Sequence, residues 1–415
     1  MDNKTVSFLL GSGFSIPEGL PSLTEINSKL SQIKEADFYL FSDQTAGFYH
    51  SDWTDPNGWM PSSFLDRLFV QEFTVFYCKE YLQGNYGEFN YEKFYDFISD
   101  FISFKIEKNK IDLFCESFNQ EYAKTKIYSN DSHNWLWRLK GVLNQLIADL
   151  LNIPKYYGYG SYSNYPPYGA FFGLLRELLK ENVVNVHTLN HDLFFDFMGE
   201  RLSDLWQHYT DGYTECGSSI YGEVLTNFKS DRGNVDKSYN VRLKYYNGEY
   251  DNKLRFFKLH GSVDRYILRL HDSSEEIRVK KDYGVREFLM ERYDEKAQKY
   301  KYEAVFTDTY PDFLSGTTEK IRQYNIPFYE SLFNHFKSNL LASSKLIIVG
   351  YGFQDKGVND YLEKYYLIYR KPMIVIDIKK PESDIIKNYE SQIHFMLKGI
   401  DGYYFEEFIS EIRNF

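Results

Sequence analysis

Four short segments of this sequence place glycine beside residues that hold hydroxyl groups or transfer protons. Glycine lets the backbone approach a ligand closely, and histidine is the side chain best suited to proton transfer near neutral pH. The segments are Gly11-Ser12-Gly13-Phe14-Ser15, Asn190-His191-Asp192, Leu259-His260-Gly261-Ser262 and Gly350-Tyr351-Gly352-Phe353-Gln354-Asp355. Together they predict a site that binds a phosphate-containing ligand and carries a general base.

The first and fourth segments are typical of phosphate-binding loops. Gly11 and Gly13 allow a pyrophosphate to approach the backbone, and a following helix N-terminus offers free N–H groups. Gly350 and Gly352 follow a second apolar run in the same way. Asp377 ends the next apolar run, where it either bonds ribose hydroxyls or acts only as a turn residue. Because Gly-x-Gly also occurs in ordinary turns, the first segment alone predicts only a phosphate-binding α/β domain.

The second and third segments carry the side chains that act on a ligand in this interpretation. Asn190 can hold a ribose hydroxyl or a water, Asp192 can accept from a ligand or brace the loop, and His260 is the candidate general base. Each has a simpler interpretation, which is a loop capped by Asn and Asp or a partly buried structural histidine. We assign the simpler, structural role to His187 and His191.

All four segments follow expected strands. Apolar runs ended by glycine or polar residues predict strands, and they alternate with stretches that predict helices. This alternation predicts a Rossmann-like, doubly wound and mostly parallel sheet, in which ligands bind beyond the carboxyl ends of the strands. A capping box at residues 22–25 predicts a helix that starts near Leu23. The expected strands are residues 6–10, 183–187, 256–260, 345–349 and 373–377, and the other helices are 171–180, 327–341 and 358–369.

A long segment without strand patterning interrupts this α/β pattern. We expect residues 1–30 and 164–415 to form the α/β domain and residues 31–163 to form a large helical insertion domain. The insertion is rich in aromatic residues, so it is either a lid that packs its own core or a surface for oligomerisation. Residues 211–252 are expected as loops with short strands, and 280–309 as a charged, partly helical periphery. The expected helices of the insertion are 61–82, 91–106, 111–126 and 134–151, followed by a loop at 156–168.

Composition limits the classes of function. Lys and Arg total 48 against 59 Asp and Glu, a formal charge of −11. A dedicated nucleic-acid binder would show a basic patch, so we expect no direct binding of nucleic acid to this chain alone. The cysteines Cys78, Cys115 and Cys216 form no Cys-x-x-Cys pair, which argues against a zinc ribbon and fits reduced thiols. With no signal-peptide core and no membrane-spanning window, we expect a cytoplasmic protein without a bound metal.

The order and spacing of the motifs resemble the sirtuin-like family. That family has a Gly-Ala-Gly-x-Ser loop with a downstream Gly-x-Pro, then Thr-x-Asn-x-Asp, Leu-His-Gly and Gly-x-Ser/Gly-x-x-Asp. The resemblance covers the α/β part of the chain and leaves residues 31–163 unexplained. The matching residues here are Gly11-Ser12-Gly13-Phe14-Ser15 with Gly19-Leu20-Pro21, then Thr188-Leu189-Asn190-His191-Asp192, Leu259-His260-Gly261 and Gly350-Tyr351-Gly352-Phe353-Gln354-Asp355.

This resemblance implies NAD as the ligand and assigns roles to individual residues. Asn190 would orient the nicotinamide ribose and an attacking water, and His260 would be the general base. The two glycine loops would hold the phosphates and the adenine ribose. The residues implied in binding are Gly11, Ser12, Gly13, Phe14, Ser15, Pro21, Asp192, Gly261, Ser262, Gly350, Tyr351, Gly352, Asp355 and Asp377.

Two departures separate the chain from the protein-deacylating sirtuins. No cysteine follows Cys216, so their four-cysteine zinc module is missing, and Pro21 is followed by Ser22-Leu23-Thr24 without their arginine. The chain looks more like the sirtuin-like proteins of bacterial anti-phage systems, which hydrolyse NAD. It most resembles the sirtuin-like subunit that works with a HerA-type ATPase.

The resemblance therefore implies an NAD hydrolase that is regulated by homo-oligomerisation and by a HerA-type partner. One alternative is an NAD-dependent deacylase or ADP-ribosyltransferase. Another is a binding module that senses NAD or ADP-ribose and controls assembly. A nuclease is a weaker alternative, because the sequence has no clustered Asp-x-Asp or His-x-His metal signature.

Overall fold

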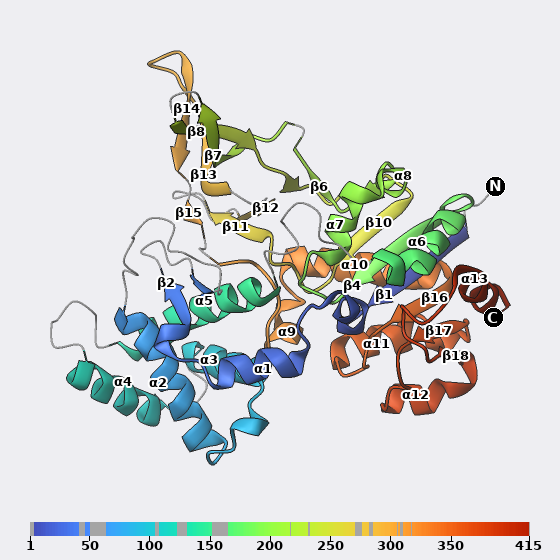
Figure 1. The fold of residues 1–415 in the computed structure, drawn as a ribbon, viewed down its shortest axis with the longest axis horizontal. Coiled ribbons are helices and arrows are strands. Elements are labelled where there is room, and N and C mark those ends of the chain that lie inside the picture. Colours follow the sequence, from blue (N-terminus) through green and yellow to red (C-terminus); the bar gives the residue numbers. More distant parts are fainter. Residues whose placement is uncertain are drawn as a thin grey trace.

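The computed structural model combines a parallel sheet, a body of helices beside it and antiparallel sheets that project on a third side (Figure 1). It describes residues 4–40, 46–49, 64–103, 108–122, 131–151, 165–215, 217–230, 233–269, 276–281, 285–304, 306–307, 310–316 and 318–414.

The seven-stranded sheet is parallel throughout, in the order β18-β17-β16-β1-β4-β10-β5. From β1 the chain builds outward through β4 and β10, then returns to the other side of β1 through β16, β17 and β18. The strand order therefore reverses between β1 and β16, which is where open α/β sheets form their ligand crevice. The strands are β1 (Lys4–Leu10), β4 (Asn182–Thr188), β5 (Tyr209–Thr210), β10 (Leu254–Lys258), β16 (Ser343–Val349), β17 (Met373–Ile376) and β18 (Ile393–Met396).

Helices cover both faces of this sheet. Because strand side chains alternate between faces, Phe8 and Leu10 of β1 pack in one core and Leu9 packs in the other. The first core includes α6 (Tyr165–Leu179), α7 (Phe194–Arg201) and α13 (Phe405–Asn414), and the second includes α10 (Pro327–Ala342), α11 (Lys356–Tyr365) and α12 (Asp384–Tyr389). The expected Rossmann-like, doubly wound fold class is confirmed.

A separate core, rich in aromatic side chains, unites five helices and a short hairpin, which we call the helical body. Phe69 stacks on Trp135 at its centre, and Ile26 and Leu30 bring in the helix that starts at the predicted capping box. The same core includes Leu193 and Val263, so the helical body packs directly on loops of the α/β part. Its elements are α1 (Leu23–Ser31), β2 (Phe38–Leu40), β3 (Ala46–Phe48), α2 (Phe64–Tyr81), α3 (Tyr91–Ile102), α4 (Lys108–Tyr122) and α5 (Ser132–Leu151).

Two antiparallel sheets replace segments that we expected to be mostly irregular. In residues 211–252, β7 (Ile220–Ser230) and β8 (Gly233–Arg242) pair along their length, so the expectation of short strands was wrong there. The expectation that residues 280–309 are partly helical was also wrong, because β13 (Val285–Asp294) pairs with β14 (Lys299–Ala304). Among the residues whose burial is described, the small core here consists of Ile220, Leu243, Leu268 and Val279. The other strands are β6 (Tyr213–Thr214), β9 (Tyr245–Tyr246), β11 (Arg265–Arg269), β12 (Glu276–Lys280) and β15 (Phe306–Thr307).

Element boundaries differ from expectation at two places that matter for the site. The strand β10 ends at Lys258, so His260 lies in the turn after the strand instead of at its last position. Helix α6 begins at Tyr165, so the end of the expected 156–168 loop is helical. The rest of that loop, residues 156–164, lies outside the described residues. The same is true of residues 61–63, 104–106 and 123–126 of the expected helices. The strand β18 and the helices α7, α12 and α13 were not expected, and neither were the short helices α8 (Ser203–Trp206) and α9 (Thr318–Gln323). None of the helices described is long and apolar enough to cross a membrane.

Candidate active site

Asn190 joins the first and second sequence segments. Its Nδ2 donates to the carbonyl of Gly11 at 2.9 Å and to Oγ of Ser15 at 3.1 Å. Its backbone N–H donates to Oγ1 of Thr188, which fixes the loop that follows β4. Both hydrogens of the amide are therefore used within the protein. Oδ1 accepts no hydrogen bond from the described residues, so it is available to a ligand hydroxyl or a water.

The side chain of Lys258 connects the second and third segments. This buried ammonium donates to the carbonyl of Asp192 at 2.5 Å and to Oγ of Ser262 at 2.7 Å, and it pairs with Oδ2 of Asp196 at 2.8 Å. Ser262 Oγ then donates to the carbonyl of His191 at 3.2 Å. Because the ammonium binds both loops at once, Lys258 sets their separation.

His260 joins the third and fourth segments. Its Nε2 lies 3.2 Å from the hydroxyl of Tyr324 and 3.6 Å from Oδ2 of Asp355. The imidazole is only 3% exposed. The ring of His191 faces it at 6.3 Å between centroids. A histidine in this setting is neutral and firmly oriented, as a general base must be.

The first and fourth segments, which are the two glycine loops, contact each other, so the four segments form a closed series of contacts. Gly13 N donates to the carbonyl of Gly350 at 3.0 Å, and Gly350 has a φ of +61°. A Cβ on Gly350 would lie 2.4 Å from the carbonyl carbon of Gly13, and one on Gly11 would lie 2.5 Å from the carbonyl oxygen of Gly350. The close contact between the two loops is therefore enough to require glycine at residues 11 and 350, whether or not a ligand is bound. We call the four connected segments, residues 11–15, 190–194, 259–263 and 350–355, the loop ring.

Several predicted ligand-binding residues make contacts within the protein that support the loop ring. The ring of Phe14 is buried against Tyr168, Phe171 and Phe194, so only its backbone is at the loop. Tyr351 is buried, and its hydroxyl donates to Oδ1 of Asn359 at 3.0 Å. Asp192, Gly261, Ser262 and Asp355 lie within the loop ring, where the two aspartates accept from backbone N–H groups at the starts of α7 and α11.

Other predicted residues have a more open position or lie apart. Ser12 and Gly352 are exposed. The Oδ1 atom of Asp377 accepts from the adjacent N–H of Ile378, the contact of a turn residue, and no hydrogen bond in the described part of the chain links that carboxylate to the loop ring. Pro21 follows the 3₁₀ turn Ile16–Glu18 and is half-buried. Their assignment to ligand binding stays a prediction.

Burial lowers the pKa of three histidines in and beneath the loop ring. The pKa of His260 is lowered well below its ordinary value by burial and by the charge of Lys320, and that of His191 by burial and by His260. Burial lowers the pKa of His187 to about 3, although its hydrogen bond with the Phe8 carbonyl opposes the shift. All three are therefore neutral at pH 7.

We expect these histidines to make the fold sensitive to mild acid. In the unfolded chain each would protonate near pH 6.5, whereas the folded chain resists protonation, so the free energy of unfolding falls as the pH drops below about 6.5. For His187, whose pKa is about 3, the expected loss between pH 6.5 and pH 5 is about 2 kcal/mol. Urea unfolding at several pH values measures it. His187→Gln should reduce this pH dependence, and His335→Gln, at a half-buried position on α10, should reduce it less. An equal pH dependence in the wild type and both variants would contradict this account.

The sequence interpretation missed four residues of this site. It assigned His191 a purely structural role and did not consider Lys258, Lys320 or Tyr324. A lysine at the end of an apolar strand, directly before Leu259-His260, was a usable signal for Lys258, because a buried lysine needs several partners. Tyr324 and Lys320 follow no motif and reach the site only through the tertiary fold.

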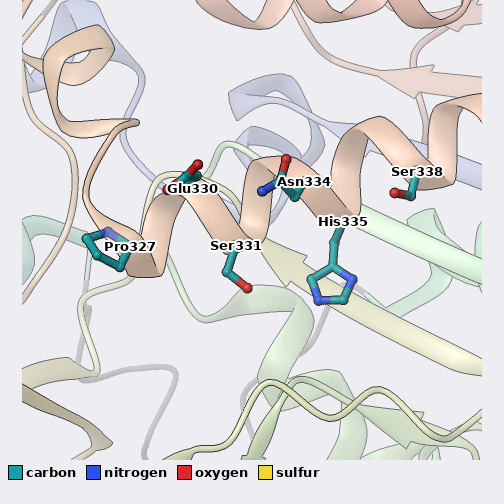
Figure 2. A pocket seen from close by; sticks show the side chains of 6 residues that line it. All are labelled: Pro327, Glu330, Ser331, Asn334, His335 and Ser338. Carbon is teal, nitrogen blue, oxygen red and sulfur yellow. The ribbon is translucent and has the colours of Figure 1, made fainter.

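A hollow along one face of α10 lies apart from the loop ring (Figure 2). It is open and polar, and the imidazole of His335 packs there against Tyr250 and Phe257. None of its lining residues belongs to the loop ring, so we use His335 only as a control position. The lining residues are Pro327, Glu330, Ser331, Asn334, His335 and Ser338.

The fold and the loop ring define a Rossmann-like α/β protein with a strand-end site. No family model and no curated protein matches the chain. Among solved structures it is similar to a mutant Sir2 homologue in complex with 2′-O-acetyl ADP ribose, at 10% identity and a TM-score of 0.37 over 100% of this chain and 93% of that one. It is also similar to a chain from a study of Sir2 enzyme mechanism and regulation, at 10% identity and a TM-score of 0.32 with the same coverage. Within the described residues, no group of three or more His, Cys, Asp or Glu side chains is arranged to hold a metal ion.

Proposed function

We propose that this protein hydrolyses NAD at the loop ring, releasing nicotinamide and ADP-ribose. The observation that carries the proposal is the closed circle of contacts at the point where the strand order reverses. It brings the amide of Asn190, the imidazole of His260 and two glycine loops to one edge of the sheet. Such an edge is where open α/β sheets bind dinucleotides.

The reaction needs little from the protein beyond position and a base. Water adds its oxygen to the ribose C1′, the C1′–N bond breaks with its electron pair leaving on nicotinamide, and one proton must be taken up. Because the nicotinamide nitrogen is cationic in NAD, departure needs no general acid, and the transition state is oxocarbenium-like as in glycoside hydrolysis. Oδ1 of Asn190 is available to orient a ribose hydroxyl or the water. The neutral His260 is the group that takes the proton.

The biological setting is proposed on the sequence resemblance. We propose that the chain acts in the cytoplasm as a homo-oligomer, together with a HerA-type ATPase, and that it depletes NAD during anti-phage defence. The helical body is the proposed regulatory element. Its core includes Leu193 and Val263, so it contacts the second and third segments of the loop ring.

The test is release of nicotinamide from NAD by the purified full chain, alone and with a HerA-type ATPase. We expect stoichiometric nicotinamide and ADP-ribose, with His335→Gln as active as wild type. Release that requires an acylated peptide would instead identify a deacylase or ADP-ribosyltransferase. Binding of NAD without turnover, alone and with the ATPase, would identify a binding module and refute the proposal.

A further inference from the structure

We propose that Tyr324 and Asp355 are positioning residues that fix the tautomer of His260, so that Nδ1 is the nitrogen that takes the proton. This inference rests on the proposed function for its kinetic consequence. The tautomer itself is a property of the folded chain and is measured without substrate.

The contacts around Nε2 of His260 form a short chain to a carboxylate. The hydroxyl of Tyr324 lies 3.2 Å from Nε2 and donates to Oδ1 of Asp355 at 3.5 Å. Tyr324 is 9% exposed, and its ring packs on that of Phe333 at 3.9 Å between centroids. The hydroxyl is thus held by packing as well as by its polar partners.

The proton count on this chain decides the tautomer. A phenolic hydroxyl has one proton, and when it donates to Asp355 its oxygen can only accept from His260. Nε2 must then carry a hydrogen, which leaves Nδ1 as the basic nitrogen. No hydrogen bond joins Nδ1 to another group in the described part of the chain. When Nδ1 takes the proton from water, the imidazolium forms with a carboxylate behind it, reached through Tyr324, which is how a buried acid orients a catalytic histidine in hydrolases.

The helical body holds Tyr324 in this position. Tyr324 follows the last turn of α9, and its N–H donates to the carbonyl of Lys320. Lys320 pairs with Glu92 at 2.5 Å and Arg322 with Asp100 at 2.8 Å, and both acids belong to α3. Figure 1 shows α9 between the helical body and the parallel sheet. The positioning of His260 therefore depends on an element that the helical body anchors.

The first experiment is nitrogen NMR on the full chain labelled at histidine, with His260→Gln to assign the signal. We expect His260 to carry its hydrogen on Nε2 in the wild type. Tyr324→Phe removes the acceptor and should leave a mixture of tautomers. Tyr361→Phe is the matched control, since its ring also packs on Phe333 while its hydroxyl does not contact His260. A hydrogen on Nδ1 in the wild type, or an unchanged signal in Tyr324→Phe, would overturn the proposal.

The second experiment is kinetic. Tyr324→Phe should lower kcat for nicotinamide release by about 10²-fold with KM nearly unchanged, because a misplaced base affects the transition state more than binding. Asp355→Asn keeps the N-cap of α11 and should act in the same direction. The double variant should be little worse than either single one, since residues that act as a unit are not additive. Additive losses, or a higher kcat in Tyr324→Phe, would contradict a positioning role.

The acid limb of the kcat/KM profile gives a readout that a purely structural role would not move. Without its hydroxyl, residue 324 no longer accepts a hydrogen bond from the imidazolium, and the direct 3.6 Å approach of Nε2 to Oδ2 of Asp355 is the contact that remains, so we expect the pKa of His260 to fall and the acid limb to shift to lower pH. The groups that face His260 are Tyr324 and Lys320 from the α9 segment, His191 from the loop after β4, and Asp355 at the start of α11. If no NAD hydrolysis is found at all, the proposed function fails while the NMR experiment still decides the tautomer.

Discussion

His260→Gln is expected to lower kcat for the proposed NAD hydrolysis by about 10²- to 10⁴-fold, the usual contribution of a positioned general base. Glutamine keeps polar contact with Tyr324 and Asp355, so the fold should persist, but it cannot take a proton near neutral pH. The measurement is nicotinamide release at saturating NAD, with melting temperature followed in parallel. Since the pKa of His260 is lowered, the wild-type acid limb of kcat/KM should lie below pH 6.5.

The comparison variants decide whether this loss is chemical. Asn190→Ala should also lower kcat, and it should raise KM as well, because Asn190 both presents Oδ1 and fixes Gly11 and Ser15. His335→Gln should behave as wild type, since that histidine lies on the α10 hollow. Full activity in His260→Gln would show that the reaction uses another base, with His191 as the next group to test.

Gly350→Ala is expected to destabilise the fold by about 4 kcal/mol or more, which puts it among the exceptional single substitutions. The new Cβ would lie 2.4 Å from Gly13 C and 2.5 Å from Gly13 Cα, and both are backbone atoms that cannot rotate away. The φ of +61° adds strain for any residue with a Cβ. Thermal unfolding of the purified variant, or its failure to accumulate as folded protein, gives the result.

Gly352→Ala is the matched control for this prediction. It belongs to the same segment, but a Cβ there would meet only the flexible Gln354 side chain at 3.9 Å. We expect a change in stability of about 0.5 kcal/mol at most. If the two variants melt at the same temperature, close contact between the glycine loops is not what requires glycine at residue 350.

Much of the α/β fold follows from local sequence patterns. The apolar runs at residues 6–10 and 345–349 predicted buried strands, and the structure places them side by side in parallel register. The capping box at Ser22 and Glu25 is formed as expected. Periodicity was informative for these elements because burial of one face or both imposes the pattern, although α7, α12, α13 and β18 also pack in the cores and were not predicted. The sequence patterns did not predict the long antiparallel strands β7, β8, β13 and β14.

The sequence by itself determined which residue types stand at the ends of the strands. Asn190, His260 and the glycines at 11, 13 and 350 were identifiable because each follows a strand, and parallel strands bring their carboxyl ends to one edge. Only the tertiary structure decided which of these residues contact one another. It showed that the glycine loops contact each other, that Lys258 ties two loops together, and that Tyr324 covers Nε2 of His260. Those contacts join residues far apart in the chain, and packing between separate elements creates them, so no local pattern could encode them.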